Sequence, residues 1–381
     1  MTNVPATEPA PLRAWLEPGY DDGRVGAWLL DLPGAFGWAR TRALARSQSL
    51  SVAGRFREWA TDHGEPVSLP PLRGVEVVEE VPATRGPDGT ERNATFGRDH
   101  RVVPVEEMET TLRRAAHARD DFCAILGRVQ QHELRRGPLP VDGERQERTG
   151  DAVARHVGSA EIWLASRLDA SVRFDGPPQD GDRDAFLAAT RTYAVERIRA
   201  LHARDPGLER TDGKGETWTM AKVLRRLLYH SLDHLWELDR RLARVDGSAD
   251  AVRVVLDRVP PIDQVIPLLR AVGWDNRADD PDRVERAIAG SREVATAWAG
   301  ERLVGMARSV SDGAINAYLA MVIVHPRWQA LGVGRRVVTA LMDGHDDLRF
   351  SLSAADGLTD WYERLGFELD PRAMVRRVRR T

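Results

Sequence analysis

The sequence has little cysteine, little lysine and no long apolar run. Cys123 is the only cysteine among 381 residues, which excludes an intramolecular disulfide framework. No apolar segment approaches the roughly 18 residues that a membrane-spanning helix needs. The first residues contain no basic stretch that leads into an apolar run. These absences predict a soluble, cytoplasmic protein without a membrane partner.

Neither sign of charge is in clear excess. The formal net charge is -3, from 55 basic and 58 acidic residues, and outside the last few residues arginine is interspersed with acids. A nucleic-acid partner is therefore not expected. The chain is too long for one ordinary core and suits two or three domains.

The first segment, residues 1–103, consists of short alternating runs broken by Gly and Pro, with one helical stretch near 41–61. This pattern predicts a small α+β module with an antiparallel sheet. The stretch LDLPGAFGWARTRALARSQSLSVAGRFREWA resembles the HicB-like fold of antitoxin partner domains, in which a similar DLPG phrase ends the second strand. A generic sheet-and-helix module that docks on the rest is the alternative.

The second segment, residues 104–246, has apolar residues at helical spacing in four stretches separated by Gly/Pro loops. The expected helices are 105–134, 147–168, 182–205 and 217–245. Each helix has one apolar stripe, and four such stripes can be buried together in a bundle.

Three histidines of this segment form a candidate metal site. His230 and His234 are four residues apart, so both side chains leave one face of the last helix. His156 lies in the second helix. The segment resembles the DinB-like family of metal-binding four-helix proteins, and the resemblance implies that His156, His230 and His234 bind one divalent metal, either Zn, Ni or Fe. A metal that only braces the fold is the alternative.

The third segment, residues 250–381, alternates strands and helices, which is typical of a mixed α/β domain. A predicted strand at 317–324 is followed by Gln329, Gly332 and Gly334, and then by an apolar-periodic helix. A helix N-terminus presents unpaired N–H groups and partial positive charge, and glycine removes side chains that would block an anion. The turn suits a pyrophosphate, although a glycine pair also occurs in purely structural turns.

The phrases VHPRWQALGVG and WYERLGF, in this order and with a strand between them, resemble the GNAT acetyltransferases over about residues 251–378. The resemblance implies acetyl-CoA as the cofactor. It also implies that Val322 and Val324 offer strand backbone to the pantetheine arm, and that Tyr362 lies near the thioester sulfur. The residues that would surround the pyrophosphate are Gln329, Gly332, Val333, Gly334 and Arg335.

The resemblance implies transfer of an acetyl group to a small-molecule amine. Tyr362, with an ordinary pKa near 10, suits an acid that protonates the departing thiolate; packing beside Trp361 and Phe367 is the alternative. His325, at a strand end before a proline, is expected to be structural. The candidate general bases, with water as the alternative, are Glu301, Asp312 and Asp356.

The sequence thus predicts a multidomain α+β protein: an N-terminal α+β module, a central four-helix bundle and a C-terminal mixed α/β GNAT fold. The expected function is acetyl-CoA-dependent N-acetyltransfer to an amine that the sequence does not identify. One alternative is a metal-dependent small-thiol S-transferase coupled to acetylation. Another is a regulatory protein that senses acetyl-CoA. The oligomeric state stays open.

Overall fold

The computed structural model describes residues 10–70, 72–86, 89–140, 148–245 and 248–376. The outer ends of the three predicted domains, at residues 1, 246 and 381, lie outside these ranges. Within the described residues no helix is long and apolar enough to cross a membrane.

The N-terminal segment forms a four-stranded sheet in the order β3-β2-β1-β4, with one long helix. The elements are β1 (Ala10–Gly19), α1 (Tyr20–Gly23), β2 (Arg24–Trp28), β3 (Phe36–Ala39), α2 (Arg42–Asp62) and β4 (Leu72–Glu80). The prediction of an antiparallel sheet is wrong for one pair, because β4 runs parallel to β1. The reason is the crossover through α2, which returns the chain so that β4 runs in the direction of β3 and β1.

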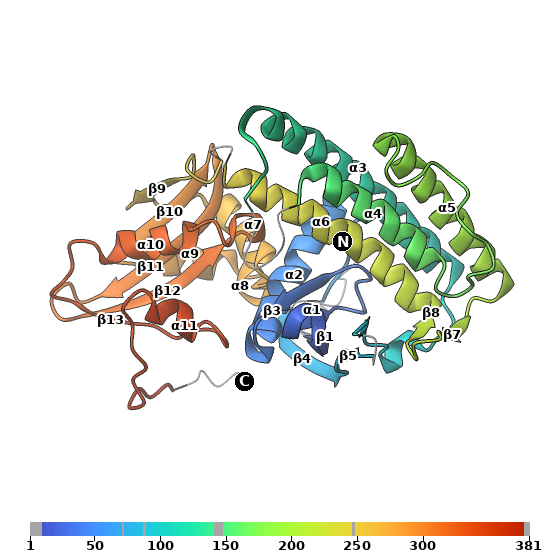
Figure 1. Ribbon diagram of the computed structural model, residues 1–381. Coiled ribbons are helices and arrows are strands. Elements are labelled where there is room, and N and C mark those ends of the chain that lie inside the picture. Colours follow the sequence, from blue (N-terminus) through green and yellow to red (C-terminus); the bar gives the residue numbers. More distant parts are fainter. Residues whose placement is uncertain (1–9, 71, 87–88, 141–147, 246–247, 377–381) are drawn as a thin grey trace, which may run out of the picture.

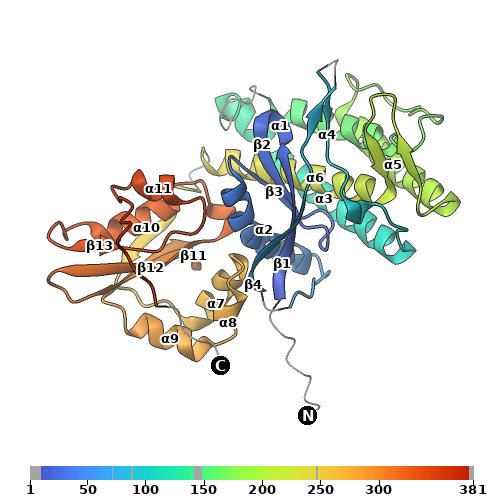
Figure 2. The ribbon, with the colours of Figure 1, turned by 90° about the horizontal axis from the view of Figure 1, so that it is seen from below.

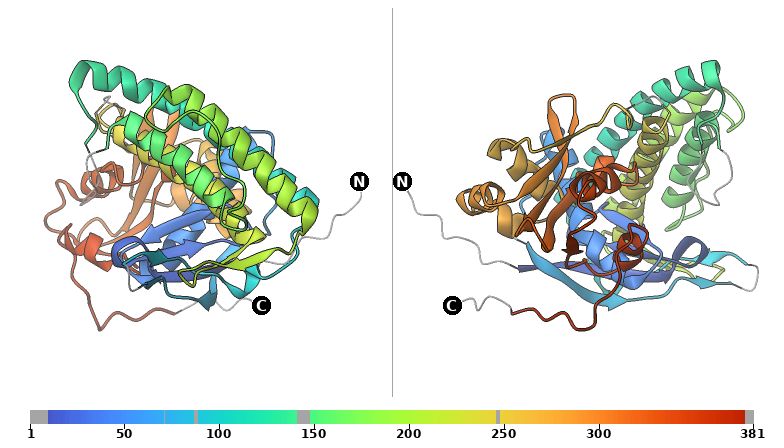
Figure 3. Two further views of the ribbon diagram at one scale, coloured as in Figure 1. Left: turned by 45° about the vertical axis from the view of Figure 1, so that its right-hand side comes forward. Right: turned by 90° about the vertical axis from the view of Figure 1, so that its left-hand side faces the viewer.

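Four long helices follow, together with short elements that connect them to the N-terminal segment. The helices are α3 (Val105–Arg136), α4 (Gly150–Ala165), α5 (Arg183–Arg204) and α6 (Met220–Ala243). The short elements are β5 (Thr84–Arg85), β6 (Glu91–Arg92), η1 (Gly97–Asp99), β7 (Glu209–Thr211) and β8 (Thr217–Thr219). Strand β7 lies where the sequence predicted a loop, and β8 occupies the first three residues of the predicted helix 217–245, so that helix begins later than predicted. Figure 3 shows the four long helices gathered on one side of the molecule.

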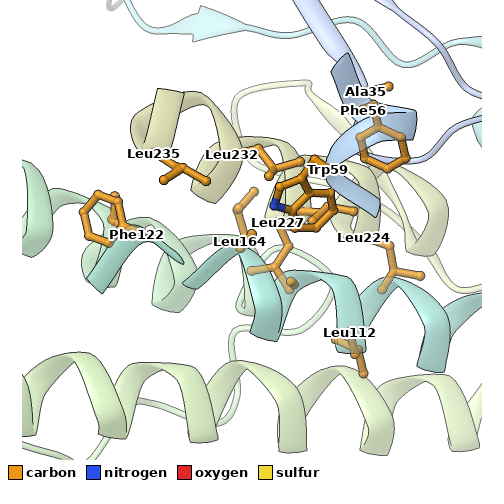
Figure 4. Packing of buried hydrophobic residues seen from close by; sticks show 14 of the residues in the cluster. Ala35, Phe56, Trp59, Leu112, Phe122, Leu164, Leu224, Leu227, Leu232 and Leu235 are labelled. Carbon is orange, nitrogen blue, oxygen red and sulfur yellow. The ribbon is translucent and has the colours of Figure 1, made fainter. Parts of the chain in front are cut away.

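A large buried cluster joins the N-terminal segment to these helices. Its members come from β1, α2 and all four long helices. Figure 4 shows Trp59 of α2 among Leu224, Leu227 and Leu232 of α6. Fully burying each such aliphatic side chain contributes about 1.5–3 kcal/mol. The first two segments therefore share one core, whereas the third segment has buried clusters of its own.

The C-terminal segment is a five-stranded sheet in the order β13-β12-β11-β10-β9, with helices on both faces. Its strands are β9 (Arg253–Leu256), β10 (Glu293–Ala299), β11 (Arg302–Ser311), β12 (Asn316–Val324) and β13 (Arg349–Ser351). Its helices are α7 (Ile262–Ala271), α8 (Asp275–Ala278), α9 (Pro281–Ala289), η2 (Pro326–Trp328), α10 (Val333–Met342) and α11 (Thr359–Glu363). Residues of α7 to α9 pack on one face and residues of α10 on the other.

Helix α2 lies between the long helices and the C-terminal domain (Figures 1 and 2). It packs closely on α7: a Cβ atom added to Gly54 would lie 2.1 Å from the carbonyl oxygen of Ala271. The Arg57 guanidinium also donates to the Asp275 carboxylate at 2.8 Å. Only glycine fits at residue 54, so this position fixes how near the two helices come.

Candidate functional site

The glycine turn after β12 leaves the start of α10 open. Gly332 is the residue before α10, with φ +78° and ψ -5°, and no side chain caps this helix. The first backbone hydrogen bond of the helix runs from the Arg336 N–H to the Gly332 carbonyl at 3.1 Å. The N–H groups of residues 333–335 therefore have no partner within the helix, and they are the donors that bind anions at helix N-termini.

The two glycines have different roles. A Cβ on Gly332 would meet no heavy atom within 4 Å, but the left-handed backbone there favours glycine. A Cβ on Gly334 would lie 3.4 Å from Trp361 and 3.5 Å from Val324, which are ordinary contacts. Gly332 thus allows the left-handed turn and leaves the space beside its backbone free of protein atoms. Gly334 instead faces the side chains of Trp361 and Val324.

The other three residues predicted to surround the pyrophosphate differ in burial and contacts. The Gln329 side chain donates to the Val324 carbonyl at 2.9 Å, so it braces the turn against the end of β12. The Val333 side chain is buried against the sheet, so only its backbone N–H can bind an anion. Arg335 is exposed in the first turn of α10.

The pairing of β12 with its outer neighbour, β13, ends before β12 reaches the turn. It pairs in parallel with β13 only over Asn316–Tyr318. On the other side, its pairing with β11 shifts register at a bulge, where Met321 has φ +51°. Among the described residues, the outer edge of β12 near Val322 therefore has no strand partner, and an extended ligand arm can pair there.

Tyr362 lies on α11, beside the start of α10. It is 8% exposed, and its ring lies 4.7 Å from Trp361 and 5.8 Å from Phe367, centroid to centroid. Burial raises the pKa of its hydroxyl, so the phenol stays protonated at neutral pH. The side chain packs with its neighbours and keeps a proton to donate.

Among the candidate bases, Asp312 has a structural role. Its carboxylate accepts the N–H groups of Ile315, Ala314 and Asn316, and these hydrogen bonds lower its pKa to about 2. Such a weak base suits a turn better than catalysis. Asp356 is exposed and pairs with Arg46 at 3.4 Å, and Glu301 lies exposed in the β10–β11 turn.

The loop from β12 to α10 is held by the two preceding segments. His325 is buried, and its Nε2 lies 2.6 Å from the Glu58 carboxylate of α2. Its Nδ1 accepts the Arg327 N–H at 3.3 Å, so Nε2 carries the proton and donates to Glu58. Arg327 in turn donates twice to Asp239 of α6, both at 3.0 Å. No local sequence pattern marks Glu58 or Asp239, so their contacts with this loop were not predicted.

Known proteins resemble the part of the chain that carries this turn. Residues 270–377 match the acetyltransferase (GNAT) domain family. The chain is 40% identical over 74 residues to GCN5-related N-acetyltransferase 2, chloroplastic, from Arabidopsis thaliana, across 19% of this chain and 29% of that protein. It is 29% identical over 135 residues to an uncharacterized ycf52-like N-acetyltransferase from Prochlorococcus marinus, across 33% of this chain and 74% of that protein.

This chain carries a GNAT acetyltransferase domain. A solved GNAT-family acetyltransferase from Streptococcus pneumoniae TIGR4 is 24% identical and covers 34% of this chain and 99% of its own. The TM-score is 0.31. The family match confirms the predicted acetyltransferase domain and implies acetyl-CoA as its cofactor. The HicB-like and DinB-like resemblances, and the boundaries between the domains, stay predictions.

Outside the GNAT domain, the structure brings the three predicted histidines together. His156 of α4 and His230 and His234 of α6 each offer a ring nitrogen, and these three atoms lie within 4.8 Å of one another. The Nε2 atoms of His156 and His230 are 3.2 Å apart. Nitrogens bound at about 2.1 Å to one tetrahedral ion lie about 3.4 Å apart, so the spacing suits a shared metal.

A buried carboxylate orients one of these rings. The Nδ1 atom of His234 lies 2.9 Å from Glu237, which also pairs with Arg241 at 3.3 Å. This contact occupies Nδ1 and leaves Nε2 for the cluster, in the manner of a carboxylate that supports a metal-binding histidine. Burial, followed by the charges of His234 and His156, lowers the pKa of His230 well below its usual value. His230 is therefore neutral at pH 7, the form that binds metal.

Proposed function

We propose that this protein transfers the acetyl group of acetyl-CoA to a small primary amine. The observation that carries the proposal is the open start of α10, where three backbone N–H groups follow β12. Among the described residues, the outer edge of this strand is unpaired near Val322. The pyrophosphate would lie on the amides of residues 333–335, and the pantetheine arm would pair with β12 near Val322.

The chemistry needs few groups beyond this binding site. The amine nitrogen attacks the thioester carbonyl, a C–N bond forms, and the C–S bond breaks. Water takes the proton that the amine loses, and Tyr362 donates a proton to the departing thiolate. A backbone N–H beyond the bulge of β12 would stabilise the tetrahedral oxyanion. The raised pKa of Tyr362 keeps this donor protonated over the whole neutral range.

The test is release of free CoA thiol from acetyl-CoA in the presence of a panel of small amines. We expect amine-dependent thiol release and an acetylated product detected by mass spectrometry. Tight binding of acetyl-CoA without any amine-dependent turnover would instead support the alternative of a protein that senses acetyl-CoA. A cytoplasmic location stays a prediction.

We also propose that His156, His230 and His234 hold one divalent metal, Zn, Ni or Fe. Their donor atoms converge from two helices, and Glu237 orients His234. Three imidazoles leave open positions for water or a thiol, so a bound metal would supply a Lewis acid that lowers the pKa of either ligand. This chemistry is the basis for the alternative of small-thiol transfer.

Elemental analysis of the purified protein, before and after reconstitution with Zn, Ni and Fe, tests the metal site. We expect about one equivalent in the wild type by the logic of a single three-ligand site. His234→Ala should lose it, while His132→Ala on α3 should keep it. A wild-type protein that stays empty after reconstitution contradicts the site. Metal-dependent consumption of a small thiol would support the S-transferase alternative.

A further inference from the structure

Two arginines on one side of the GNAT sheet have no acidic partner among the described residues. Arg308 lies on β11 and Arg277 on α8, on the sheet face that α7 to α9 cover. Among the described residues, neither guanidinium lies within 4.0 Å of a carboxylate. Arg308 donates to the Ser291 hydroxyl at 3.3 Å, and its buried Nε has no partner. Arg277 stacks on the Trp274 ring at 4.0 Å.

The strand register places Arg308 beside the bulge of β12. Arg308 is paired with Ala320, the residue before Met321. Val310 is paired with Tyr318, so the Tyr318 side chain lies on the same face as Arg308. A regular strand rises about 3.4 Å per residue, so Ala320 is at most about 7 Å from Val322, where the pantetheine arm would pair. Arg308 thus lies within the length of a small molecule from the proposed thioester position.

This part of the sheet face is accessible. Val310 is 45% exposed and Tyr318 is 42% exposed, beyond the cover that the helices give. The Tyr318 hydroxyl donates to Ser353 at 3.1 Å, which links this face to the loop before α11. A ligand can therefore reach Arg277 and Arg308 from solvent, on the side of β12 that faces away from α10.

The electrostatics of the pair favour an anion. Partial burial, followed by the positive charge of Arg308, lowers the pKa of the Arg277 guanidinium, and burial lowers the pKa of Arg308. Two neighbouring cations repel each other, and the buried Nε of Arg308 without a hydrogen-bond acceptor is unfavourable. Arginine presents a planar fork of donors that matches a carboxylate or a phosphate, so such a group would relieve both costs.

We infer that the acceptor amine carries an anionic group, a carboxylate or a phosphate, that binds between Arg277 and Arg308 while its amine reaches the thioester beside the β12 bulge. The inference rests on the proposed acetyltransferase function and specifies its substrate class. The short span from Arg308 to Val322 fits compact amines, in which a few bonds separate the nitrogen from the anion.

The test compares amines with and without an anionic group. Glycine is compared with glycinamide, and phosphoethanolamine with ethanolamine. The first pair tests recognition of a carboxylate and the second tests recognition of a phosphate. We expect kcat/KM to favour the anionic member of at least one pair by about 10-fold or more, because hydrogen bonds to charged groups have that strength. Equal kcat/KM within both pairs, or a preference for the neutral members, overturns the inference.

Variants connect the preference to the two arginines. Arg308→Gln and Arg277→Gln should raise KM for the preferred anionic amine about 10-fold or more and leave the Kd of acetyl-CoA unchanged, while Arg308→Lys should restore part of the preference. Arg286→Gln on α9 removes an exposed charge nearby and serves as the matched control. A KM that responds equally to Arg286→Gln and Arg308→Gln contradicts the assignment. Unchanged melting temperatures exclude misfolding.

A binding measurement separates this inference from the proposed function. If none of these amines is acetylated, acetate and inorganic phosphate are titrated into the CoA complex and followed by NMR. Saturable binding of either anion that is lost in Arg308→Gln supports the anion site even where the acetyltransfer assay fails. Absence of saturable binding, or binding that Arg308→Gln leaves intact, overturns it.

Discussion

Replacing Gly332 by alanine tests the acetyl-CoA turn most directly. Gly332 has φ +78°, a backbone conformation that costs other residues about 1–2 kcal/mol. The added methyl group would meet no protein atom within 4 Å. If the backbone keeps its conformation, the methyl group occupies the space through which the anion approaches. If the backbone relaxes, the first N–H groups of α10 turn away from the anion.

Either response weakens the same interaction. A hydrogen bond to a charged group contributes about 1.5–3 kcal/mol, so loss of one amide–phosphate bond raises the Kd of acetyl-CoA about 10- to 150-fold. Isothermal titration calorimetry measures this change, and a thermal melt measures the accompanying loss of stability. Gly334→Ala should have the smaller effect on affinity, because its methyl group makes ordinary contacts with Trp361 and Val324.

Gly344 provides a matched control. It also has a left-handed backbone, φ +81°, and a Cβ there would likewise meet no atom within 4 Å. It lies just beyond the opposite end of α10. Gly344→Ala should therefore cost similar stability and leave the Kd of acetyl-CoA unchanged. If Gly332→Ala and Gly344→Ala both bind acetyl-CoA as tightly as the wild type, the turn is not the pyrophosphate site.

Three further changes test other contacts. Tyr362→Phe should lower kcat by roughly 100-fold or more and leave the Kd of acetyl-CoA nearly unchanged, because the lost proton donor acts only on the departing thiolate. Steady-state kinetics measures this change, and an unchanged kcat would mean that Tyr362 only packs. Glu237→Gln should weaken metal binding about 10- to 100-fold, because His234 loses the carboxylate that orients its ring. Competition with a chelator measures the affinity, and equal affinity in the variant and the wild type would show that Glu237 does not support the site. Burial raises the pKa of Glu58, but His325 and Arg302 outweigh it and lower that pKa from 4.5 to about 2. Glu58→Gln should therefore melt at a lower temperature than the wild type at pH 7, and the difference should shrink as the pH falls from 4.5 to 2; a difference that is constant with pH would contradict this role.

The sequence predicted the features that depend on local spacing. The spacing of Gln329, Gly332 and Gly334 after an apolar strand indicated a helix N-terminus with clear backbone, and the structure has an uncapped helix there. The four-residue spacing of His230 and His234 predicted that both lie on one face of α6. The position of His156 relative to them depended on the family resemblance, because periodicity does not define how two helices pack.

Features that depend on distant contacts had no signal in the sequence. The parallel pairing of β4 with β1 follows from the crossover through α2, and strand composition does not encode direction. The bulge of β12 lies at Met321, and methionine is not a residue that marks a left-handed backbone. Arg308 was one of many arginines until the strand register placed it beside that bulge.

One helix, α6, connects the proposed metal site to the proposed acetyl-CoA site, yet the contacts between them predict weak coupling. Asp239 follows His234 by five residues, about 7.5 Å along α6 at 1.5 Å per residue, and it pairs with Arg327 in the loop before the turn. The Arg327 side chain is 52% exposed, and an exposed ion pair contributes about 0.2–1 kcal/mol. Losing this pair would change the Kd of acetyl-CoA by at most about 5-fold. The buried clusters on either side are separate, so removing the metal should act on acetyl-CoA affinity only through such surface contacts.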